Sequence, residues 1–197
     1  MVRLLCNGTP MKQKPVVVEE RMAAQSRFFH VQERLLRFRS GEELRVERLL
    51  DGGHRSVITV AMLDDDRFIL IREYAAGVHS FVLTLPMGGV ERDERVEDAA
   101  RRELAEEVGY TAQTVTYLQT LSLVPSHLQH TISVCVATGL TPAEGEGDEF
   151  EPIVSHSYSM SNLLELTTGG KFTEARSIAA VYMARDWLKK GKLLDER

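Results

Sequence analysis

The sequence predicts an α+β fold, in which helices cover both faces of a mixed β-sheet and a small β section precedes it. Two observations carry this prediction. Between residues 56 and 138 the apolar runs are short and strand-like, and the alternation in the last two, 114–123 and 131–138, is only partial, as expected for a mixed sheet covered on both faces. One amphipathic helix interrupts these runs at residues 95–108, and two further helices close the chain.

Composition and length indicate one globular core with an appendage. The chain has 197 residues, of which 43% are hydrophobic and 27% are charged. Its formal charge of −5 argues against a nucleic-acid surface, which needs a basic excess. No apolar window is long enough to span a membrane. The apolar run among the first residues is too short for a signal peptide. Cys6 and Cys135 make no disulfide framework, which fits a reducing cytosol. Together with the charge and the lack of a spanning segment, this leads us to expect a cytoplasmic protein without nucleic-acid or membrane partners.

The first 50 residues predict a small β section. After a polar stretch at 1–15, the runs 16–20, 28–38 and 43–50 look like strands, with Ser40 and Gly41 forming a hairpin turn. Phe28 and Phe29 have two interpretations, as core aromatics or as a platform on which an adenine stacks. The core is favoured, because aromatic side chains bury a large apolar area. We therefore divide the chain into residues 1–50 and a main domain at 51–197, although the first part is too small to fold alone.

The main domain begins with strands at 56–63 and 67–72, which a turn of three aspartates joins. A strand at 81–85 leads through Pro86 into a glycine loop and then the helix 95–108, where Gly109 is the expected left-handed stop. Strands follow at 114–123 and 131–138. A short helix capped by Ser161 runs to 166, and the last helix starts near Thr173 and stops before Gly191.

The most informative stretch runs from Gly88 to Gly109, with the pattern G-x5-E-x7-R-E-L-x-E-E-x-G. On a helical wheel of about 100° per residue with Glu103 at zero, Glu107 falls at about +40° and Glu106 at about −60°. The apolar residues that share this half of the helix are Val96, Ala99 and Ala100. The glutamates therefore extend the inward face of the helix and do not lie on its solvated face.

Carboxylates on an inward face repel one another and lose hydration unless a cation compensates them. A hard divalent cation such as Mg²⁺ does so, because it takes oxygen ligands and combines one or two carboxylates with substrate phosphates. The alternative is a charged surface helix with accidental spacing, since charge runs usually are solvated faces. Eight fixed positions within 22 residues favour the metal-binding interpretation.

This stretch resembles the Nudix box, the signature of Nudix hydrolases, which cleave nucleoside diphosphates linked to another group. The match is complete except at the last position, where Tyr110 replaces the usual aliphatic residue. The resemblance implies a Nudix fold, an α/β/α sandwich with a mixed β-sheet. It implies two or more Mg²⁺ or Mn²⁺ ions per site and catalytic roles for Arg102, which orients a carboxylate, and Glu106. The metal ligands that it implies are Glu103, Glu107, Glu106 and the backbone carbonyl of Met87.

Residues outside the box resemble the ADP-sugar branch of the family, and within it the ADP-compounds hydrolase (NudE-type) group. They comprise 70–74, Pro125, 147–149 and 174–176. A proline at this distance after the box is typical of enzymes that act on ADP-ribose. Ala75 stands where many ADP-sugar enzymes carry an arginine, which argues against strict ADP-ribose specificity. The predicted substrate-binding residues are Arg72 as a phosphate contact, Phe28 and Pro125.

The acidic loop at 141–152 holds five carboxylates. It is either a solvated connection or the source of a catalytic group, since loops on a rigid scaffold often carry such groups. In similar Nudix enzymes the general base comes from the matching loop, and by position Glu149 is the first choice and Glu151 the second. In the same enzymes the N-terminal section pairs two subunits, so the resemblance also implies a homodimer in which aromatics of one chain reach the other's site.

The predicted reaction is hydrolysis of an ADP-linked compound to AMP and a phosphate of the linked group. The substrates considered are ADP-ribose, NADH, diadenosine polyphosphates and ADP-sugars. Metal ions neutralise the diphosphate and activate a water, and a loop carboxylate takes its proton. Two alternatives stay open. One is a dinucleoside-polyphosphate or nucleoside-triphosphate hydrolase with the same box. The other is a non-catalytic nucleotide sensor, which is expected to have eroded ligands or an added DNA-binding segment.

Overall fold

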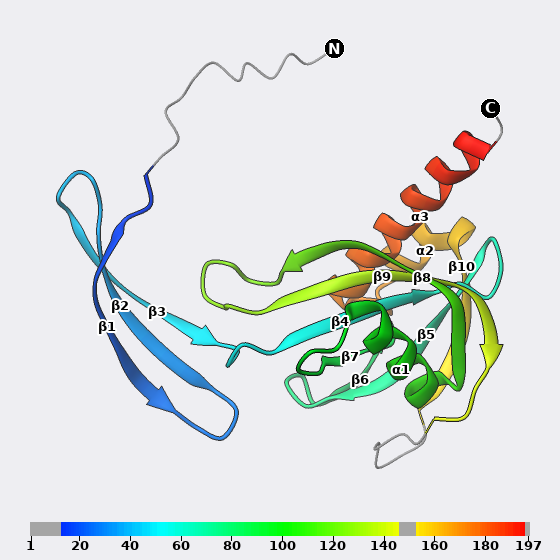
Figure 1. Ribbon diagram of the computed structural model, residues 1–197, viewed down its shortest axis with the longest axis horizontal. Coiled ribbons are helices and arrows are strands. Elements are labelled where there is room, and N and C mark those ends of the chain that lie inside the picture. The colour runs from blue at the N-terminus through cyan, green and yellow to red at the C-terminus, as the bar shows by residue number, and fades with distance from the viewer. Residues whose placement is uncertain (1–12, 146–152, 196–197) are drawn as a thin grey trace. The chain divides into compact units, whose positions relative to one another are not determined.

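The computed structural model describes residues 13–145 and 153–195 of the chain, and its elements are labelled in Figure 1. The chain forms two compact units. One consists of Met1–Gly53 with Val124–Gln129, and the other of His54–Leu123 with His130–Arg197. The segment Val124–Gln129 thus joins the first unit, whereas the predicted division at residue 50 assigns it to the main domain. That the first unit pairs two subunits stays a prediction.

The first unit is an antiparallel sheet in the order β1-β2-β3, built from β1 (Val16–Gln25), β2 (His30–Arg37) and β3 (Glu43–Leu50). Ion pairs hold neighbouring strands together. Glu33 on β2 contacts Arg21 at 2.8 Å and Arg45 at 2.9 Å, and its hydrogen bond from Arg21 lowers its pKa despite some desolvation. The segment Val124–Gln129 attaches to β3, because the Leu49 amide donates to the His127 carbonyl at 2.8 Å.

Phe28 and Phe29 are not core aromatics in this chain, so the favoured interpretation of these residues is wrong. They lie between β1 and β2, and 76% and 62% of their surfaces are exposed. The Ser26 hydroxyl oxygen shapes this turn by accepting from the Phe29 amide at 2.9 Å.

The second unit contains the remaining strands and the helices. Its strands are β4 (Arg55–Ala61), β5 (Arg67–Ala75), β6 (Ser80–Thr84), β7 (Met87–Val90), β8 (Tyr110–Ser122), β9 (Thr131–Pro142) and β10 (Val154–Ser159). Within the described residues they form a sheet in the order β7-β4-β9-β8 and another in the order β10-β5-β6. The strands β4 and β9 are parallel, and every other neighbouring pair is antiparallel. The predicted mixed sheet is therefore confirmed.

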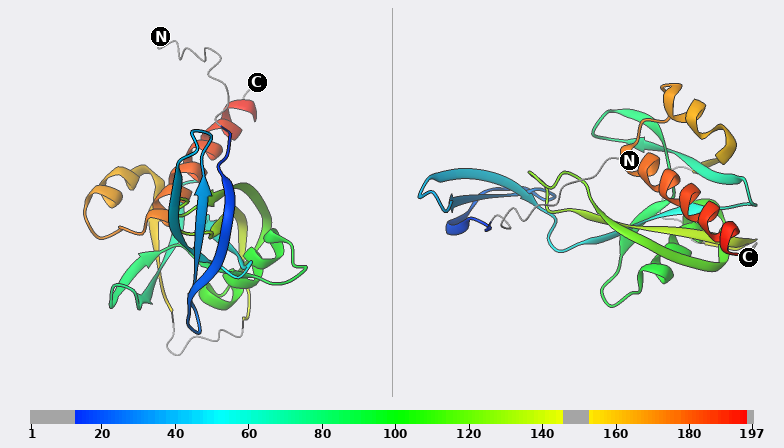
Figure 2. Two further views of the ribbon diagram at one scale, coloured as in Figure 1. Left: turned by 90° about the vertical axis from the view of Figure 1, so that its left-hand side faces the viewer. Right: turned by 90° about the horizontal axis from the view of Figure 1, so that it is seen from above.

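Helices pack on both faces of this sheet system, as the views in Figure 2 show. They are α1 (Val96–Val108), the 3₁₀ helix η1 (Met160–Asn162), α2 (Leu163–Thr168) and α3 (Ala175–Asp195). On the α3 side, Ile58 of β4 packs with Phe68 of β5 and Val181 of α3. On the α1 side, Ile69 of β5 packs with Leu104. Successive strand residues thus serve opposite faces of the sheet, and the α/β/α arrangement predicted for the fold is present.

Two predicted details at the helix ends are wrong. Ser159, not Ser161, caps η1, because its side chain accepts from the Ser161 amide at 3.0 Å, while the Ser161 hydroxyl donates to Asp66 at 2.7 Å. Helix α3 continues through Gly191 to Asp195. A lone glycine costs a helix only about 1 kcal/mol relative to alanine, so it does not force the helix to end.

Among the described residues, no helix has both the length and the apolar character that crossing a bilayer requires.

Candidate active site

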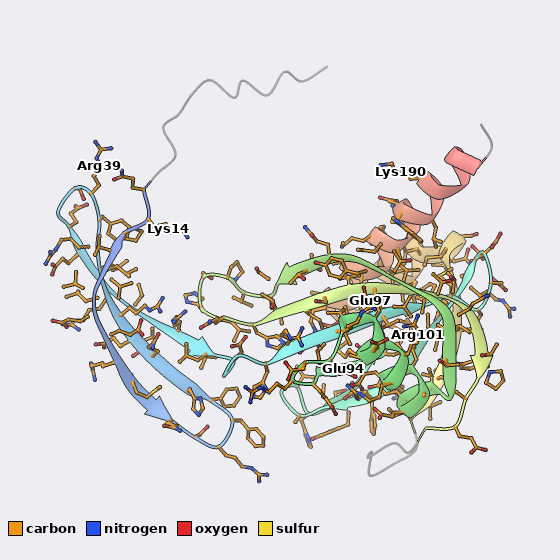
Figure 3. The ribbon with its side chains drawn as sticks, in the orientation of Figure 1. Lys14, Arg39, Glu94, Glu97, Arg101 and Lys190 are labelled. Carbon is orange, nitrogen blue, oxygen red and sulfur yellow. The ribbon has the colours of Figure 1, made fainter. Side chains whose placement is uncertain are left out.

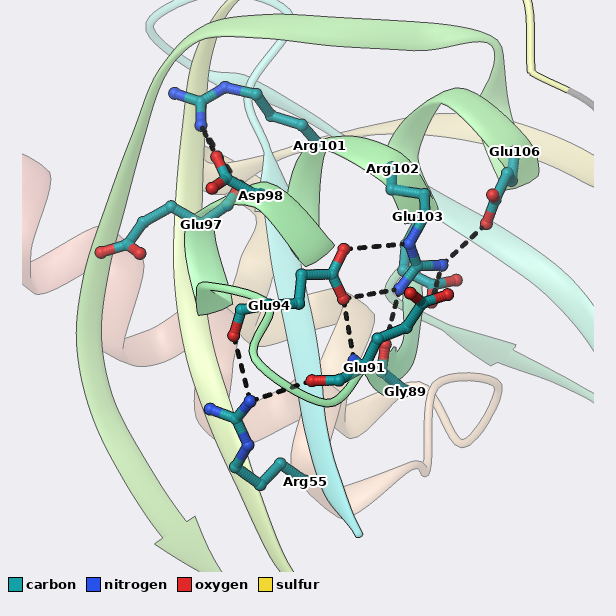
Figure 4. A network of polar contacts seen from close by, with 10 residues as sticks. All are labelled: Arg55, Gly89, Glu91, Glu94, Glu97, Asp98, Arg101, Arg102, Glu103 and Glu106. Carbon is teal, nitrogen blue, oxygen red and sulfur yellow. Dashed lines mark hydrogen bonds and ion pairs between the residues drawn. The ribbon is translucent and has the colours of Figure 1, made fainter.

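Helix α1 carries the clustered glutamates and is oriented by its buried residues. Ala99, Ala100 and Leu104 are buried against the sheet. The helix ends at Gly109, which has φ 70° and donates its amide to the Ala105 carbonyl at 3.2 Å, so glycine is required here for the left-handed conformation. On the outward side Arg101 contacts Asp98 at 3.3 Å, away from the glutamate cluster (Figures 3 and 4). The predicted orientation of the helix is confirmed.

Glu103 lies between α1 and β7 and is nearly buried. Its side chain is 12% exposed. Its carboxylate lies so close to the Cα of Gly88 that a Cβ added there would overlap it. Burial raises the pKa of Glu103, and hydrogen bonding from Arg102 opposes this rise only in part. A buried carboxylate of this kind gains most when a cation binds it.

Arg102 is the centre of the polar network in Figure 4. One guanidinium nitrogen, Nη1, donates to Glu103 at 2.7 Å and to Glu106 at 3.0 Å. Its Nε donates to Glu94 at 3.1 Å, and its Nη2 donates to the Gly89 carbonyl at 2.7 Å. These contacts, foremost the hydrogen bond to Glu94, raise the pKa of Arg102, which therefore stays charged. Arg102 therefore bonds both Glu103 and Glu106.

Glu107 reaches the start of β7. Its Oε2 accepts from the Met87 amide at 3.1 Å, which brings it beside the residue whose carbonyl is a predicted ligand. Glu106 is more open, with 31% of its side chain exposed. The structure therefore brings together Glu103, Glu106, Glu107 and the backbone of Met87 at one end of β7 and one side of α1.

The oxygen donors at this place suit a hard divalent cation, Mg²⁺ or Mn²⁺. Within residues 13–145 and 153–195, however, no three acidic, histidine or cysteine side chains are gathered closely enough to hold a metal. The Arg102 guanidinium contacts Glu94, Glu103 and Glu106 together.

Glu94 is a residue to which sequence reasoning gave no role. Both of its carboxylate oxygens accept from Arg102, and its Oε2 also accepts from the Glu91 amide at 2.8 Å. The hydrogen bond from Arg102 lowers the pKa of Glu94 despite desolvation. Arg55 donates to the carbonyls of Glu91 and Glu94, each at 3.0 Å, and so fastens the loop before α1. The fixed spacing of Glu94 and Arg102 in the box pattern is the sequence feature that could have indicated this contact.

The predicted general bases Glu149 and Glu151 lie outside the described residues. The described chain before them ends at Gly145, where an added Cβ would overlap the Ala105 carbonyl of α1. The Ala143 amide also donates to the Gly109 carbonyl at 2.9 Å. The acidic loop thus starts in contact with the helix that carries the glutamates.

Three predicted substrate-binding residues remain, namely Arg72, Phe28 and Pro125. Arg72 follows Phe68 and Leu70 at even spacing on β5, and these residues pack on the α3 side, whereas Ile69 packs on α1. Phe28 and Pro125 belong to the first compact unit. Substrate contact by these three residues stays a prediction.

Comparison with known proteins places this geometry in a family. The NUDIX domain model matches residues 53–180. The chain is 37% identical over 177 residues to the ADP compounds hydrolase NudE of Escherichia coli (strain K12), covering 90% of this chain and 95% of that protein. It is 26% identical over 128 residues to an ADP-ribose pyrophosphatase of Bacillus subtilis (strain 168), covering 64% and 69%.

A solved structure of an ADP compounds hydrolase superposes with a TM-score of 0.87 at 36% sequence identity, covering 93% of this chain and 98% of that one. The chain therefore belongs to the Nudix family of hydrolases.

Proposed function

We propose that this protein is a divalent-metal-dependent pyrophosphohydrolase that cleaves ADP-linked compounds to AMP and a phosphate of the linked group. The observation that carries the proposal is the position of Glu103 beneath Gly88, with Glu107 bonded to the Met87 amide. Similarity over nearly the whole chain to a hydrolase of ADP compounds supports the substrate class. ADP-ribose, NADH, diadenosine polyphosphates and ADP-sugars are the substrates we consider.

In this proposal Glu103, Glu106, Glu107 and the Met87 carbonyl hold the metal ions, two or more Mg²⁺ or Mn²⁺. When bound, the ions neutralise the diphosphate and lower the pKa of the attacking water. Arg102 positions Glu103 and Glu106, since it bonds both at once. Glu94 holds Arg102 in place from the other side. The protein therefore contributes a prearranged set of acceptor oxygens, and Arg102 offsets only part of their negative charge before the substrate arrives.

A carboxylate of the acidic loop, Glu149 or Glu151, takes the proton from the attacking water in this scheme. The contact of Gly145 with the Ala105 backbone supports the choice of this loop, because it anchors one end of the loop to α1. Comparing Glu149→Gln with Glu151→Gln assigns the base. The correct replacement lowers kcat by about a hundredfold or more, and the other leaves it within a few fold.

We further propose a cytoplasmic homodimer formed through the first unit. Apolar side chains along the edge strand β1 support this, since Val16 is 66% exposed and Met22 is 48% exposed in the single chain. Exposed apolar side chains on an edge strand favour pairing with another chain. Light scattering on the full chain is expected to give twice 22.2 kDa, and Met22→Lys is expected to shift the mass towards the monomer.

The deciding experiment is a substrate panel in Mg²⁺ with product identification by chromatography. ADP-ribose, NADH, diadenosine triphosphate, ADP-glucose and dGTP are compared at equal concentration. Release of AMP from the ADP-linked compounds, with dGTP untouched, supports the proposal. Preferred cleavage of dGTP would make the protein a nucleoside-triphosphate hydrolase, and binding without turnover of any compound would make it a nucleotide sensor.

A further inference from the structure

A pocket of about 410 Å³ lies on one face of the sheet β10-β5-β6. The described residues that line it are Arg72, Phe81, Leu83, His156, Tyr158 and Lys171. The strand register places these side chains on the same face, because Arg72 pairs with Leu83 and the partner of Tyr158 is Phe68. Phe68 belongs to the core on the α3 side. The pocket therefore opens on the opposite face of this sheet from α1 and its glutamates.

The pocket is basic in a protein whose net charge is −5. Arg72 and Lys171 are basic side chains, and no carboxylate is among the described residues of the lining. Neither of them forms an ion pair with an acidic side chain in the part of the chain that the structure describes, whereas Arg21, Arg102 and Arg176 do. Two cations that line the same pocket repel each other and attract an anion.

Arg72 makes a cation–π contact in this pocket. Its guanidinium carbon lies 5.4 Å from the centre of the Phe81 ring. The guanidinium N–H groups can donate to an oxyanion in a bidentate manner. Lys171 adds a second donor from the segment between α2 and α3. An arginine fork with a lysine beside it suits a phosphate monoester, which carries up to two negative charges.

The same pocket offers flat apolar walls. Tyr158 is half-buried, with its ring centre 6.4 Å from that of Phe68, and Leu83 packs against the same core. Phe81 is 52% exposed, so part of its surface is open to contact. The volume exceeds what a lone phosphate needs and lies within the range of about 300–1,000 Å³ that small-molecule sites occupy. A ligand with a planar ring beside its phosphate can contact both the two basic side chains and the aromatic walls of the pocket.

We propose that this pocket binds a nucleoside monophosphate, with its phosphate at Arg72 and Lys171 and its ring against Phe81 and Tyr158, independently of metal. AMP, the product of the proposed reaction, has this chemistry. Binding at this pocket does not require that reaction, because the site lies apart from the glutamates. If both proposals hold, the protein carries a product site on the face opposite to its hydrolytic site.

The test is calorimetric titration of the full chain with AMP in EDTA, so that the metal site contributes nothing. One-site binding that weakens with ionic strength is expected. Arg72→Gln and Lys171→Gln are each expected to weaken AMP binding by about tenfold or more, because each removes a charge-assisted hydrogen bond. Glu107→Gln is expected to keep the AMP affinity of the wild type. These results stand whether or not the protein hydrolyses ADP-linked compounds.

Arg185→Gln is the matched control. Arg185 also lies over an aromatic ring, 4.6 Å from the centre of Tyr182, but outside this pocket. Its replacement is expected to leave AMP binding unchanged, and thermal unfolding checks that all variants are folded.

Inorganic phosphate and adenosine serve as partial ligands, and each is expected to bind more weakly than AMP. The proposal is overturned by absence of AMP binding at millimolar concentration, or by binding that Glu107→Gln abolishes and Arg72→Gln leaves intact. Phosphate that binds as tightly as AMP would equally contradict it, because the ring contacts would then contribute nothing.

Discussion

The carboxylate of Glu103 fills the space that a side chain at residue 88 would occupy. Glycine at this position is therefore a condition for burying Glu103 beneath β7. A Cβ added at the adjacent Gly89 would have no heavy atom within 4 Å. A side chain can therefore be accommodated at residue 89 but not at residue 88.

This difference gives a sharp prediction. Gly88→Ala displaces the Glu103 carboxylate, and we expect a loss of about 1–3 kcal/mol in unfolding free energy, as for overpacking, together with weaker Mg²⁺ binding. Gly89→Ala is the matched control and is expected to keep Mg²⁺ affinity. Calorimetric Mg²⁺ titration and urea unfolding measure both. Equal behaviour of the two variants would show that Glu103 is free to move.

Glu107→Gln tests the metal assignment. The amide keeps the size of the side chain and can still accept from Met87, but it removes a negative ligand. We expect kcat on the best ADP-linked substrate to fall by two or more orders of magnitude with little change in Tm. Asp98→Asn, on the outward side of the same helix, serves as the control and is expected to keep kcat. Near-normal turnover of Glu107→Gln would remove Glu107 from the metal site.

Replacing Arg102 by methionine leaves Glu94, Glu103 and Glu106 without their shared cation. In EDTA we expect the unfolding free energy to drop by about 1–3 kcal/mol, because hydrogen bonds to charged groups are lost and carboxylates repel. In millimolar Mg²⁺ the drop is expected to be smaller if the proposed metal ions bind the same oxygens as Arg102. Urea unfolding in both conditions measures the difference. A destabilisation that Mg²⁺ does not change would argue against such binding.

Ser177 connects the start of α3 with the strand end before the glycine loop. It is fully buried, accepts from the Leu85 amide at 2.9 Å and donates to Glu174 at 2.8 Å. Ser177→Ala leaves the Leu85 amide unsatisfied, and we expect a loss of about 1–3 kcal/mol in unfolding free energy. Ser157→Ala, at an exposed strand position, is expected to change it by less than about 0.5 kcal/mol. Urea unfolding of both variants gives the comparison.

The lowered pKa of Glu174 predicts part of the loss of stability of the fold in acid. Burial alone raises its pKa, but hydrogen bonds from Arg176 and Ser177 outweigh burial and lower it below 4.5. A carboxylate with a depressed pKa in the folded state stabilises the protein above its unfolded pKa, and that contribution is lost as pH falls through the folded pKa. We therefore expect Glu174→Gln to have a lower free energy of unfolding than the wild type at pH 7. This difference is expected to shrink as the pH falls below about 4.5. A difference that is constant with pH would contradict this assignment.

Much of the main domain was predictable because its strands are short apolar runs bounded by turn residues and its box helix has strong periodicity. The inward face of α1 followed from helical geometry alone, since Ala99, Ala100 and Leu104 fix which side is buried. The exposure of Phe28 was not predictable in the same way, because the N-terminal sheet of the single chain has one layer, and composition does not reveal whether another layer covers it.

The placement of Arg72 shows another limit. Its distance along β5 from Ile69 and Leu70 determines its face, but the sequence does not say which face α1 covers. Only the packed structure shows that the odd-numbered residues of β5 face α1 and the even-numbered residues face α3. Likewise the contacts of Arg102 with Glu94 and the Gly89 carbonyl depend on the folding back of the loop before α1.

The parallel pairing of β4 with β9 has a consequence for the order of assembly. Residues Ser56–Ala61 pair with Ile132–Ala137, and β7, α1 and β8 all lie in the chain between them. This contact closes a long loop, and closing such loops slows folding. On the ribosome, the glutamates of α1 are synthesised well before β9 emerges to complete the sheet beneath them. The nascent chain therefore contains the glutamates of α1 before it contains the strand that completes the sheet. Hydrolytic activity is expected only after β9 has been synthesised.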